Sequence, residues 1–462
     1  MGINCSDYLF FQKDADFFVY DKKSAYLFPI DSLHFEIGQT LQSTYLRDRT
    51  VLDVQFFLQR EKANNPAIVR EHYAFVLMFL SENGQGNPNI KTISELDIIY
   101  SISIVPHIVV EVTERCNFRC NYCCFGEMYD TLSNGAARIQ DMPEDDCLNC
   151  LRELLAKKNL LYSNKTVISF FGGEPFLNFR LIRRIVLFCK EEFPEIEFQF
   201  RATTNGTLIK THIAFLIEHD FHLLVSLDGD EKSNKHRCFS DGRLGFATVK
   251  ANIDYVYKEH REYFISNIRF TSVLHRDSSI VSICRFFSKY EKTPLLTNLS
   301  SEGIVTEKQI VFPYAGVNPQ EMSVLYEINP DIYDLIIKED KNALPINLPF
   351  SSQRYSNLRG CFLFENKVFL AADRHIYLCE KTSRKFPFGS FDHGVLRFYL
   401  QDINGYYDTF RKVVKSECVD CSMHYLCARC FFEGPSTMIP PMKCKISDIE
   451  MKKKLLQTLD NE

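Results

Sequence analysis

The sequence contains no tryptophan, no hydrophobic run long enough to cross a membrane, and no block of basic residues. A spanning helix needs about 20 consecutive apolar residues, so we expect no membrane partner. The N-terminus also lacks the apolar core of a secretion signal. With a formal net charge of -5 and no basic stripe, the chain does not have the composition of a nucleic-acid-binding protein. We therefore expect a cytoplasmic protein that binds neither nucleic acid nor membrane.

The 17 cysteines are the most informative residues of the chain. Because the cytosol keeps thiols reduced, a cytoplasmic protein is not expected to use them as a disulfide framework. Their placement is uneven, with three between 116 and 123 and seven between 361 and 444. Grouped cysteines in a reducing compartment favour metal or iron–sulfur ligation.

Residues 1–104 are predicted to form a small separate module. Phe17–Tyr20 and Ala25–Phe28 are apolar segments on either side of a short polar turn, a pattern typical of a β-hairpin. The stretch Asn83–Asn89 is rich in Gly and Asn and predicts a loop or hinge.

Residues 105–315 change to strands that alternate with helices. One helix is expected from near Asp141, with Pro143 in its first turn and with Cys147 and Cys150 buried on its apolar face. Alternation of this kind predicts βαβ units and a parallel sheet. The predicted strands are Ile108–Thr113, Val167–Phe171, Glu197–Thr203, Leu223–Leu227 and Ile268–Val273. Residues 316–354 then form a connecting segment, and residues 355–462 are rich in cysteine, with short strands expected at Lys367–Leu370 and Ile376–Leu378.

Cys116, Cys120 and Cys123 form a CxxxCxxC pattern directly after the first predicted strand. Three thiolates can hold three irons of a [4Fe–4S] cluster and leave the fourth iron open. A zinc site is the alternative, although structural zinc sites usually have four ligands at other spacings. The pattern resembles that of the radical S-adenosylmethionine (SAM) superfamily. This resemblance implies an enzyme with an α/β fold, a partial (βα)6 TIM-like barrel, whose cluster binds SAM and cleaves it to a 5′-deoxyadenosyl radical.

Turn motifs follow the next three predicted strands, and on their own they could be plain strand-to-helix turns. Glycines allow a ligand to approach the backbone closely, and the carboxyl ends of such strands are the usual face for chemistry. The resemblance implies that Glu174 binds the methionine ammonium and that the later turns line the ribose and methionine. The SAM-binding residues implied in this way are Gly172, Gly173, Glu174, Pro175, Thr204, Asn205, Ser226 and Asp228.

The C-terminal cysteines resemble the SPASM domain, which carries two auxiliary [4Fe–4S] clusters in enzymes that modify peptides and proteins. The resemblance implies that Cys361, Cys379 and Cys430 hold the first cluster, and that Cys418, Cys421, Cys427 and Cys444 hold the second. Two features depart from the SPASM pattern: Arg374 occupies a position where glycine is usual, and the spacing between Cys427 and Cys430 is short. The alternative is a structural zinc ribbon.

Glu380 directly follows Cys379. In sulfatase-maturating relatives an Asp at the matching position acts as a base, so the resemblance implies a catalytic role for Glu380. The alternative is a surface glutamate paired with Lys381 or Arg384.

These features together predict a radical SAM/SPASM maturase of a ribosomally made precursor peptide (RiPP), which forms a thioether or carbon–carbon crosslink. The N-terminal module resembles the winged-helix-like element with which such maturases bind a leader peptide as an added strand. A reductant such as flavodoxin or ferredoxin is the expected protein partner. The alternatives are an anaerobic sulfatase-maturating (formylglycine-generating) enzyme and a non-catalytic iron–sulfur or zinc protein.

Overall fold

The computed structural model describes most of the chain's central part and shorter pieces at both ends. The described residues are 8–21, 26–30, 92–123, 140–160, 163–275, 278–298, 366–392 and 395–417, with single residues between 32 and 39, between 324 and 328, and at 363 and 364.

The centre of the fold is a ten-stranded sheet in the order β13-β12-β11-β10-β4-β5-β6-β7-β8-β9. Its last six strands are parallel and follow one another in chain order. They are β4 (His107–Thr113), β5 (Lys165–Gly172), β6 (Glu197–Thr204), β7 (His222–Ser226), β8 (Ile268–Leu274) and β9 (Leu295–Asn298). The five predicted strands are confirmed to within two residues at either end, whereas β9 was not predicted.

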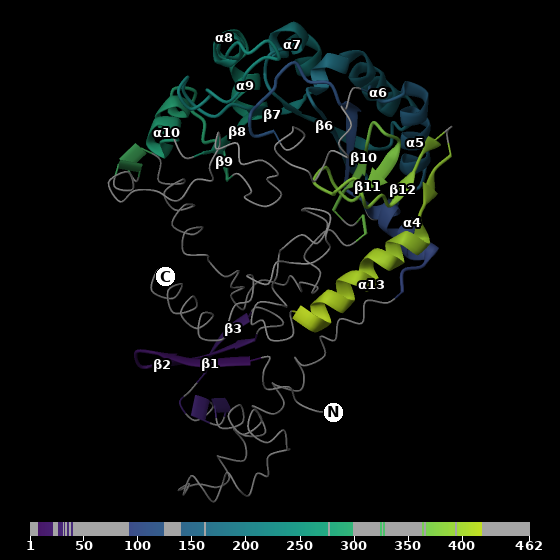
Figure 1. Cartoon of the computed structure of the whole chain (residues 1–462), viewed down its shortest axis with the longest axis vertical. Helices are drawn as coiled ribbons and strands as arrows, with labels where there is room; N and C mark the ends of the chain where they lie inside the picture. Colours follow the sequence, from purple (N-terminus) through teal and green to yellow (C-terminus); the bar gives the residue numbers. More distant parts are fainter. Residues whose placement is uncertain are drawn as a thin grey trace, which may run out of the picture.

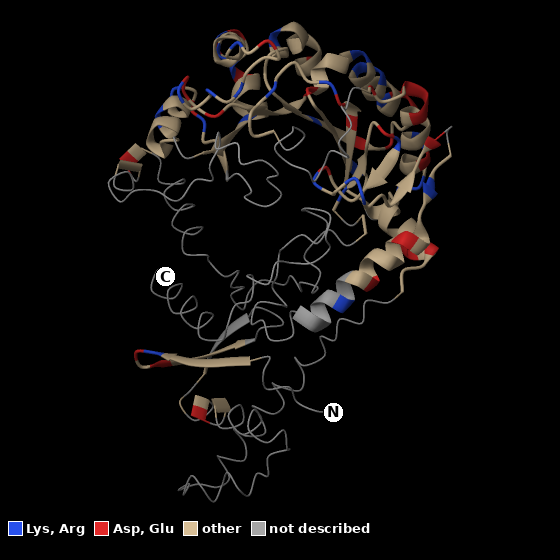
Figure 2. Cartoon of the chain, in the orientation of Figure 1, with Lys and Arg blue, Asp and Glu red and all other residues tan. Residues whose placement is uncertain are grey.

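Helices connect these strands and cover one face of the sheet. Figure 1 shows them on the outer, convex side of the curved sheet, and Figure 2 shows that they carry charges of both signs. They are α5 (Glu144–Ala156), α6 (Phe179–Glu192), α7 (Ile209–Glu218), α8 (Phe246–Glu259), α9 (Arg261–Asn267) and α10 (Ile280–Ser288). The fold is therefore α/β with a mostly parallel central sheet, and its six parallel strands agree with the predicted partial (βα)6 unit.

The packing of α5 follows from its sequence. The helix begins at Glu144, directly after Pro143, and has three acidic residues in its first turn, where they interact favourably with the positive end of the helix dipole. Cys147 and Cys150 lie on its inner face and are 0% and 2% exposed. The prediction that these two cysteines belong to the core is confirmed.

The described C-terminal strands extend the same sheet at its other edge. β10 (Val368–Leu370) runs parallel to β4, and β11 (His375–Tyr377), β12 (Gly389–Ser390) and β13 (Arg397–Phe398) continue antiparallel from it. The two short strands expected here are confirmed, but the pairing of β10 with β4 was not predicted. Two helices flank this edge in the chain, α4 (Glu95–Ile104) before β4 and α13 (Leu400–Glu417) after β13.

The turn between β10 and β11 contains Arg374, the residue that stands where the SPASM pattern has glycine. Its φ of 66° lies in the left-handed region that glycine favours and that costs other residues about 1–2 kcal/mol. Its backbone N–H donates to the Ala371 carbonyl at 3.0 Å, and its side chain pairs with Asp146 at 2.9 Å. The chain therefore keeps the backbone conformation of a glycine turn with an arginine in it.

A separate antiparallel sheet lies near the N-terminus, formed by β1 (Tyr8–Lys13), β2 (Asp16–Asp21) and β3 (Tyr26–Ile30). The predicted hairpin corresponds to β2 and β3, which pair with Tyr20 opposite Leu27, while β1 was not predicted. The expected loop at 83–89 and most of the expected peptide-recognition module lie outside the described residues. Among the helices that the structure describes, none combines the length and apolar character needed to cross a membrane.

Candidate functional site

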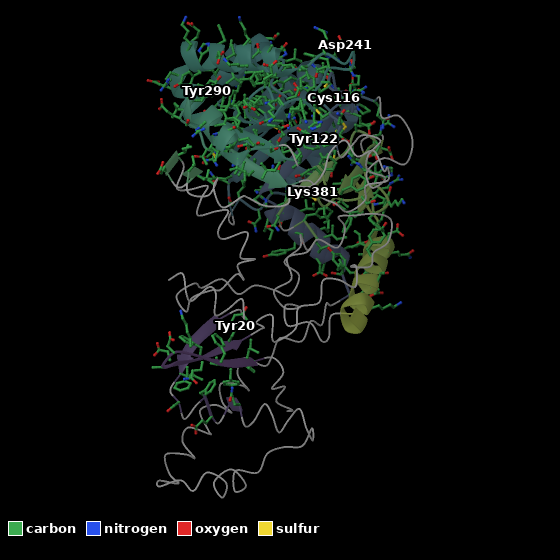
Figure 3. The ribbon with its side chains drawn as sticks, turned by 60° about the vertical axis from the view of Figure 1, so that its left-hand side comes forward. Tyr20, Cys116, Tyr122, Asp241, Tyr290 and Lys381 are labelled. Atoms are coloured by element: carbon green, nitrogen blue, oxygen red, sulfur yellow. The ribbon has the colours of Figure 1, made fainter. Side chains whose placement is uncertain are left out.

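The loop that carries Cys116, Cys120 and Cys123 leaves the carboxyl end of β4, and the three cysteines are half-buried and form no disulfide. Figure 3 shows Cys116 and Tyr122 in the same part of the main domain. The backbone of this cysteine loop (residues 114–123) pairs with the segment that follows β7. The N–H of Arg119 donates to the carbonyl of residue 238 at 2.7 Å, and that of residue 121 to the carbonyl of residue 236 at 3.1 Å.

The surroundings of the three thiols fit a multi-iron cluster. Burial raises the pKa of Cys116 to about 11 and that of Cys120 to about 12, so their thiolates need a positively charged group beside them. In the part of the chain that the structure describes, no three His, Cys, Asp or Glu side chains converge on the position of one metal ion. Three thiols that share one loop can serve as ligands to three irons of a [4Fe–4S] cluster.

The turn at the end of β5 packs against the end of β4 and the start of the cysteine loop. Gly172 has a φ of +145°, and a Cβ on it would lie 2.0 Å from the carbonyl oxygen of Thr113. A Cβ on Gly173 would lie 2.4 Å from the carbonyl oxygen of Arg115. The N–H of Gly173 also donates to the carbonyl of Thr113 at 3.0 Å, which holds the two segments this close. A Cβ at either position would overlap a carbonyl oxygen, so only glycine fits at both. Pro175 then begins the short 3-10 helix η2 (Pro175–Asn178).

Glu174 lies at the centre of a buried hydrogen-bond network. Its carboxylate accepts from the N–H of Phe176 at 3.1 Å, from the hydroxyl of Thr204 at 2.8 Å and from the N–H of Asn205 at 2.7 Å. Its side chain is fully buried, and this burial raises its pKa to about 7. A cation bound nearby would favour the charged form of this carboxylate.

Asn205 continues this network to the cysteine loop. Its side-chain amide donates to the side-chain oxygen of Asn117 at 2.7 Å and lies 4.0 Å from the sulfur of Cys116. Its amide oxygen accepts from the N–H of Thr207 at 3.0 Å. A continuous set of hydrogen bonds therefore joins the ends of β5 and β6 to the loop that holds the first cysteine.

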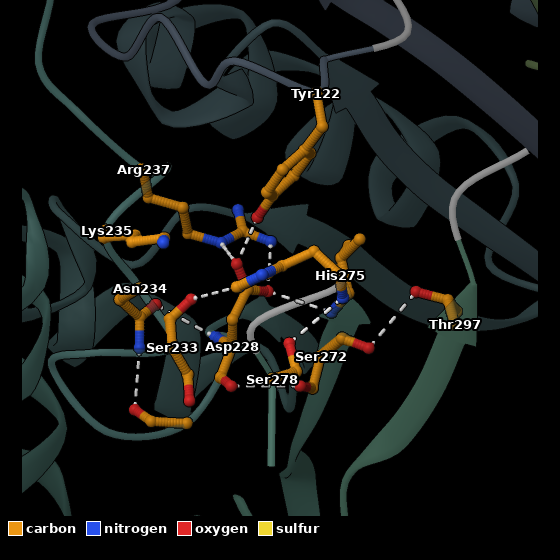
Figure 4. Close-up of polar contacts among 12 residues, drawn as sticks. Tyr122, Asp228, Ser233, Asn234, Lys235, Arg237, Ser272, His275, Ser278 and Thr297 are labelled. Atoms are coloured by element: carbon orange, nitrogen blue, oxygen red, sulfur yellow. Dashed lines mark hydrogen bonds and ion pairs between the residues drawn. The ribbon is translucent and has the colours of Figure 1, made fainter. Parts of the chain in front are cut away.

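Asp228, just beyond β7, anchors a second network (Figure 4). Its carboxylate accepts from the hydroxyl of Tyr122, from Nε and Nη2 of Arg237 at 2.9 and 3.0 Å, and from the N–H of Val273 at 2.9 Å. Asp228 is 0% exposed, so protein donors occupy both of its oxygens. Asp228 is tied to the cysteine loop directly by Tyr122. The Arg237 side chain, to which the sequence assigned no role, holds the same carboxylate through two hydrogen bonds.

The side chains at the ends of β6 and β7 divide between the two faces of the sheet. Thr204 lies on the helix side, where it supports Glu174, and its neighbour Thr203 lies on the opposite, concave face with Ser226. Among the described residues, neither the Thr203 nor the Ser226 hydroxyl has a hydrogen-bond partner. Thr203 was missed as a candidate, although the two-residue period of strand β6 could have distinguished it from Thr204.

Glu380 lies away from the cysteine loop. Its carboxylate pairs with Lys367, whose Nζ is 3.2 Å from both oxygens. Lys367 precedes β10 and is level with His107 at the start of β4, whereas the cysteine loop leaves the other end of that strand. The suggested partners Lys381 and Arg384 are wrong; Arg384 instead bonds to the buried carboxylate of Glu111 at 3.1 Å.

Of the seven cysteines assigned to auxiliary clusters, only Cys379 belongs to the described residues, where it is half-buried and forms no disulfide. Its N–H donates to the hydroxyl of Thr382 at 3.2 Å. The other six lie outside the described residues: Cys361, Cys418, Cys421, Cys427, Cys430 and Cys444.

Comparison with known proteins identifies the domain that holds the cysteine loop. Residues 110–273 match the model of the radical SAM superfamily. An uncharacterised protein of Methanocaldococcus jannaschii is 36% identical over 138 residues, which are 30% of this chain and 43% of that protein. The radical SAM cyclopropyl synthase TigE of Paramaledivibacter caminithermalis is 27% identical over 176 residues, which are 37% of this chain and 36% of TigE. The chain thus matches less than half the length of either relative.

The fold also resembles solved structures. The structure of anSMEcpe with bound AdoMet and the Cp18Cys peptide superposes with a TM-score of 0.52 and 16% sequence identity, over 77% of this chain and 98% of that one. At this identity the likeness concerns the fold alone. A radical SAM domain uses a [4Fe–4S] cluster and SAM. Because they match the family model, residues 110–273 form a radical SAM domain, and the chain is an enzyme.

Proposed function

We propose that this chain is a peptide maturase that uses SAM to crosslink a ribosomally made precursor peptide through a thioether or carbon–carbon bond. The observation that carries the proposal is the hydrogen-bond network from Glu174 through Asn205 to Asn117 and the cysteine loop. It joins the CxxxCxxC loop to the two turns beside it at the carboxyl ends of neighbouring parallel strands, as a site that serves one bound molecule requires.

In this proposal, Cys116, Cys120 and Cys123 hold the [4Fe–4S] cluster. When bound and reduced, the cluster supplies the electron that cleaves SAM to a 5′-deoxyadenosyl radical. Gly172 and Gly173 let this turn pack closely on residues 113 and 115, and its backbone binds the SAM methionine. Glu174 balances the methionine ammonium.

The remaining assignments separate a direct role from supporting ones. The hydroxyl of Ser226 lies on the concave face, where it can bond to SAM. Thr204 and Asn205 position Glu174 and the cysteine loop, Pro175 starts the turn into η2, and Asp228 holds Tyr122. These last four side chains support the SAM site through the protein.

A peptide substrate is supported by the relatives. TigE is named as a cyclopropyl synthase, and anSMEcpe, similar in fold, has been solved with a peptide bound. We extend the proposal to domains at 1–104 for peptide recognition, 105–315 for the barrel, 316–354 for the connection and 355–462 for SPASM with two auxiliary [4Fe–4S] clusters. A flavodoxin or ferredoxin would reduce the protein. No comparison favours the formylglycine-generating alternative.

Product analysis tests this function. Reconstituted protein, SAM and a reductant are incubated with each short peptide encoded near its gene. One of these reactions should give 5′-deoxyadenosine together with a peptide that is lighter by two hydrogens. Forming a thioether or carbon–carbon crosslink removes one hydrogen from each of the two atoms joined. One would leave as a hydrogen atom to the 5′-deoxyadenosyl radical, and the other as a proton whose electron passes to an auxiliary cluster. Mass spectrometry detects the loss of both. SAM cleavage by a protein that leaves every such peptide unchanged in mass would contradict the proposal.

Glu380 is proposed to accept a proton from the peptide as the crosslink forms. Replacing it by Gln should leave SAM cleavage in place and lower product formation by about a hundredfold, the usual size of a general-base contribution. Product yield and 5′-deoxyadenosine are measured in the same reaction.

Lys367 provides the control for this prediction, because it is the ion-pair partner of Glu380. The Glu380→Gln change leaves the Lys367 ammonium half-buried without its counter-ion, which could disturb the site by itself. Adding Lys367→Gln removes that charge. If the double variant regains product, Glu380 acts only by pairing with Lys367, and its role as a base is wrong.

A further inference from the structure

The concave face of the sheet differs sharply from the face that the helices cover. Ile108, Phe200 and Val225 point to the helices and are at most 1% exposed. Because successive side chains of a strand point to opposite faces, their neighbours line the concave side. On the amino-terminal half of that side, these neighbours are largely polar or charged: His107, Lys165, Ser169, Glu197, Gln199, Arg201, His222, Arg269 and Lys367. The acidic Glu197 pairs with Lys165 at 3.3 Å.

Hydrogen bonds join several of these side chains across neighbouring strands. The His107 ring bonds to the hydroxyl of Ser169 on β5 at 2.6 Å. On β6, the Nε of Arg201 donates to the side-chain oxygen of Gln199 at 2.9 Å, and Gln199 bonds to the ring of His222 on β7 at 3.2 Å. These residues therefore form a polar row that crosses the sheet, which we call the basic row together with Lys367 and Arg269.

Two of the three cations in the basic row have no ion pair with a carboxylate among the described residues. Glu380 neutralises Lys367, with both oxygens 3.2 Å from the ammonium. Arg201 and Arg269 are exposed, and within the described ranges no carboxylate forms an ion pair with either. Asp220 lies 4.0 Å from the His222 ring, but its side chain is 82% exposed.

The pKa values of the two imidazoles are lowered by burial and by the positive charges on this face. The pKa of His107 is lowered to about 4, first by burial and then by the charge of Lys367. Burial also lowers the pKa of His222, and the charges of Arg201 and Arg269 add to this effect against a nearby carboxylate. Both rings are therefore neutral at pH 7, so they can accept or donate hydrogen bonds without adding charge.

We infer that Arg201 and Arg269 bind a carboxylate of the peptide substrate, so that the enzyme prefers peptides with an acidic group near the residue that it modifies. The inference rests on the proposed function and adds the substrate class. A guanidinium presents paired N–H donors that match the two oxygens of a carboxylate. The His222 ring lies between the two arginines across the strands and can supply a further hydrogen bond.

The register of β6 sets the distance of this subsite from the SAM site. Arg201 stands three residues before Thr204 on the same strand, which at about 3.3 Å per residue is about 10 Å from its carboxyl end. An extended peptide covers that distance in about three residues. The acidic group should therefore lie within about three residues of the atom that loses hydrogen.

Selection from a peptide library tests the inference. Short peptides with randomised internal positions and amidated C-termini are passed, without oxygen and with SAM, over immobilised reconstituted enzyme. Amino-acid analysis of the retained pool should show Asp and Glu enriched about tenfold, the discrimination expected of a charge-assisted hydrogen bond. The Arg201→Gln and Arg269→Gln double variant should lose this enrichment. A wild-type pool with no acidic enrichment in any arm, or an enrichment that the double variant keeps, overturns the inference.

A second library with free C-termini distinguishes the two sources of a carboxylate. Retention that depends on the free C-terminus and not on Asp or Glu would assign the subsite to the end of the peptide. Retention that depends on Asp or Glu in both libraries would assign it to a side chain. The matched control changes Arg180 and Arg184 of the outer helix α6 to Gln, with the same loss of charge, and should keep the wild-type enrichment.

Reversing the charge gives a test that a folding defect cannot imitate. The Arg201→Glu and Arg269→Glu double variant should retain peptides enriched in Lys and Arg. Acidic enrichment by a protein that does not cleave SAM would contradict the proposed function and leave the subsite standing. SAM cleavage by a protein that shows no acidic enrichment would overturn the subsite and leave the proposed function standing.

Discussion

Replacing Cys116, Cys120 and Cys123 together by Ala should abolish the formation of 5′-deoxyadenosine from SAM. The three thiols are the cluster ligands of the proposed site. Burial raises the pKa of Cys116 to about 11, so this thiol stays protonated at neutral pH unless a metal binds it. Iron per chain should fall by about four, the content of one [4Fe–4S] cluster. Anaerobic SAM cleavage and iron analysis on the same reconstituted sample measure both effects.

Cys147 and Cys150 provide the matched control, because they form the other CxxC pair of the same domain. Both are buried in the core face of α5 and are assigned no role in SAM binding. Their double change to Ala should keep the iron content and SAM cleavage of the wild type. If the triple variant of the loop still produces 5′-deoxyadenosine, the assignment of the SAM cluster to this loop is wrong.

Much of the central fold was predictable because its signals are local. The first five parallel strands are short apolar runs that alternate with amphipathic helices, and Pro143 with the acids after it marks the start of α5. The turn glycines Gly172 and Gly173 were also visible, since they directly follow an apolar run. Such features depend on residues close together in the chain.

The interactions that were missed join residues far apart in the sequence. β9 has only four residues, Leu295–Asn298, too few for a clear pattern. β10 pairs with β4 across more than half of the chain, and no local pattern encodes such a pairing. The contact of Tyr122 with Asp228 spans 106 positions. The role of Arg237, which donates to the same carboxylate, depends on this distant contact, and so it could not be recognised in the sequence.

The second large effect is expected at Asp228, where replacement by Asn should lower the free energy of unfolding by about 3 kcal/mol. Asn keeps the size of the side chain, but its amide nitrogen cannot accept the bonds that Asp228 now accepts from Arg237 and Tyr122. The guanidinium of Arg237, 9% exposed, would be left as a buried charge without its partner. Urea unfolding followed by circular dichroism measures the change.

Two further variants decide whether the unpaired charge is the cause. Adding Arg237→Gln to Asp228→Asn removes the buried cation, so the double variant should unfold at a higher urea concentration than Asp228→Asn alone. Asp241→Asn breaks an exposed ion pair with Arg243 and should leave the unfolding midpoint near that of the wild type, because such pairs contribute little. If Asp228→Asn unfolds like the wild type, water must reach Arg237, and the pair would not be what holds Tyr122 and the cysteine loop against the end of β7.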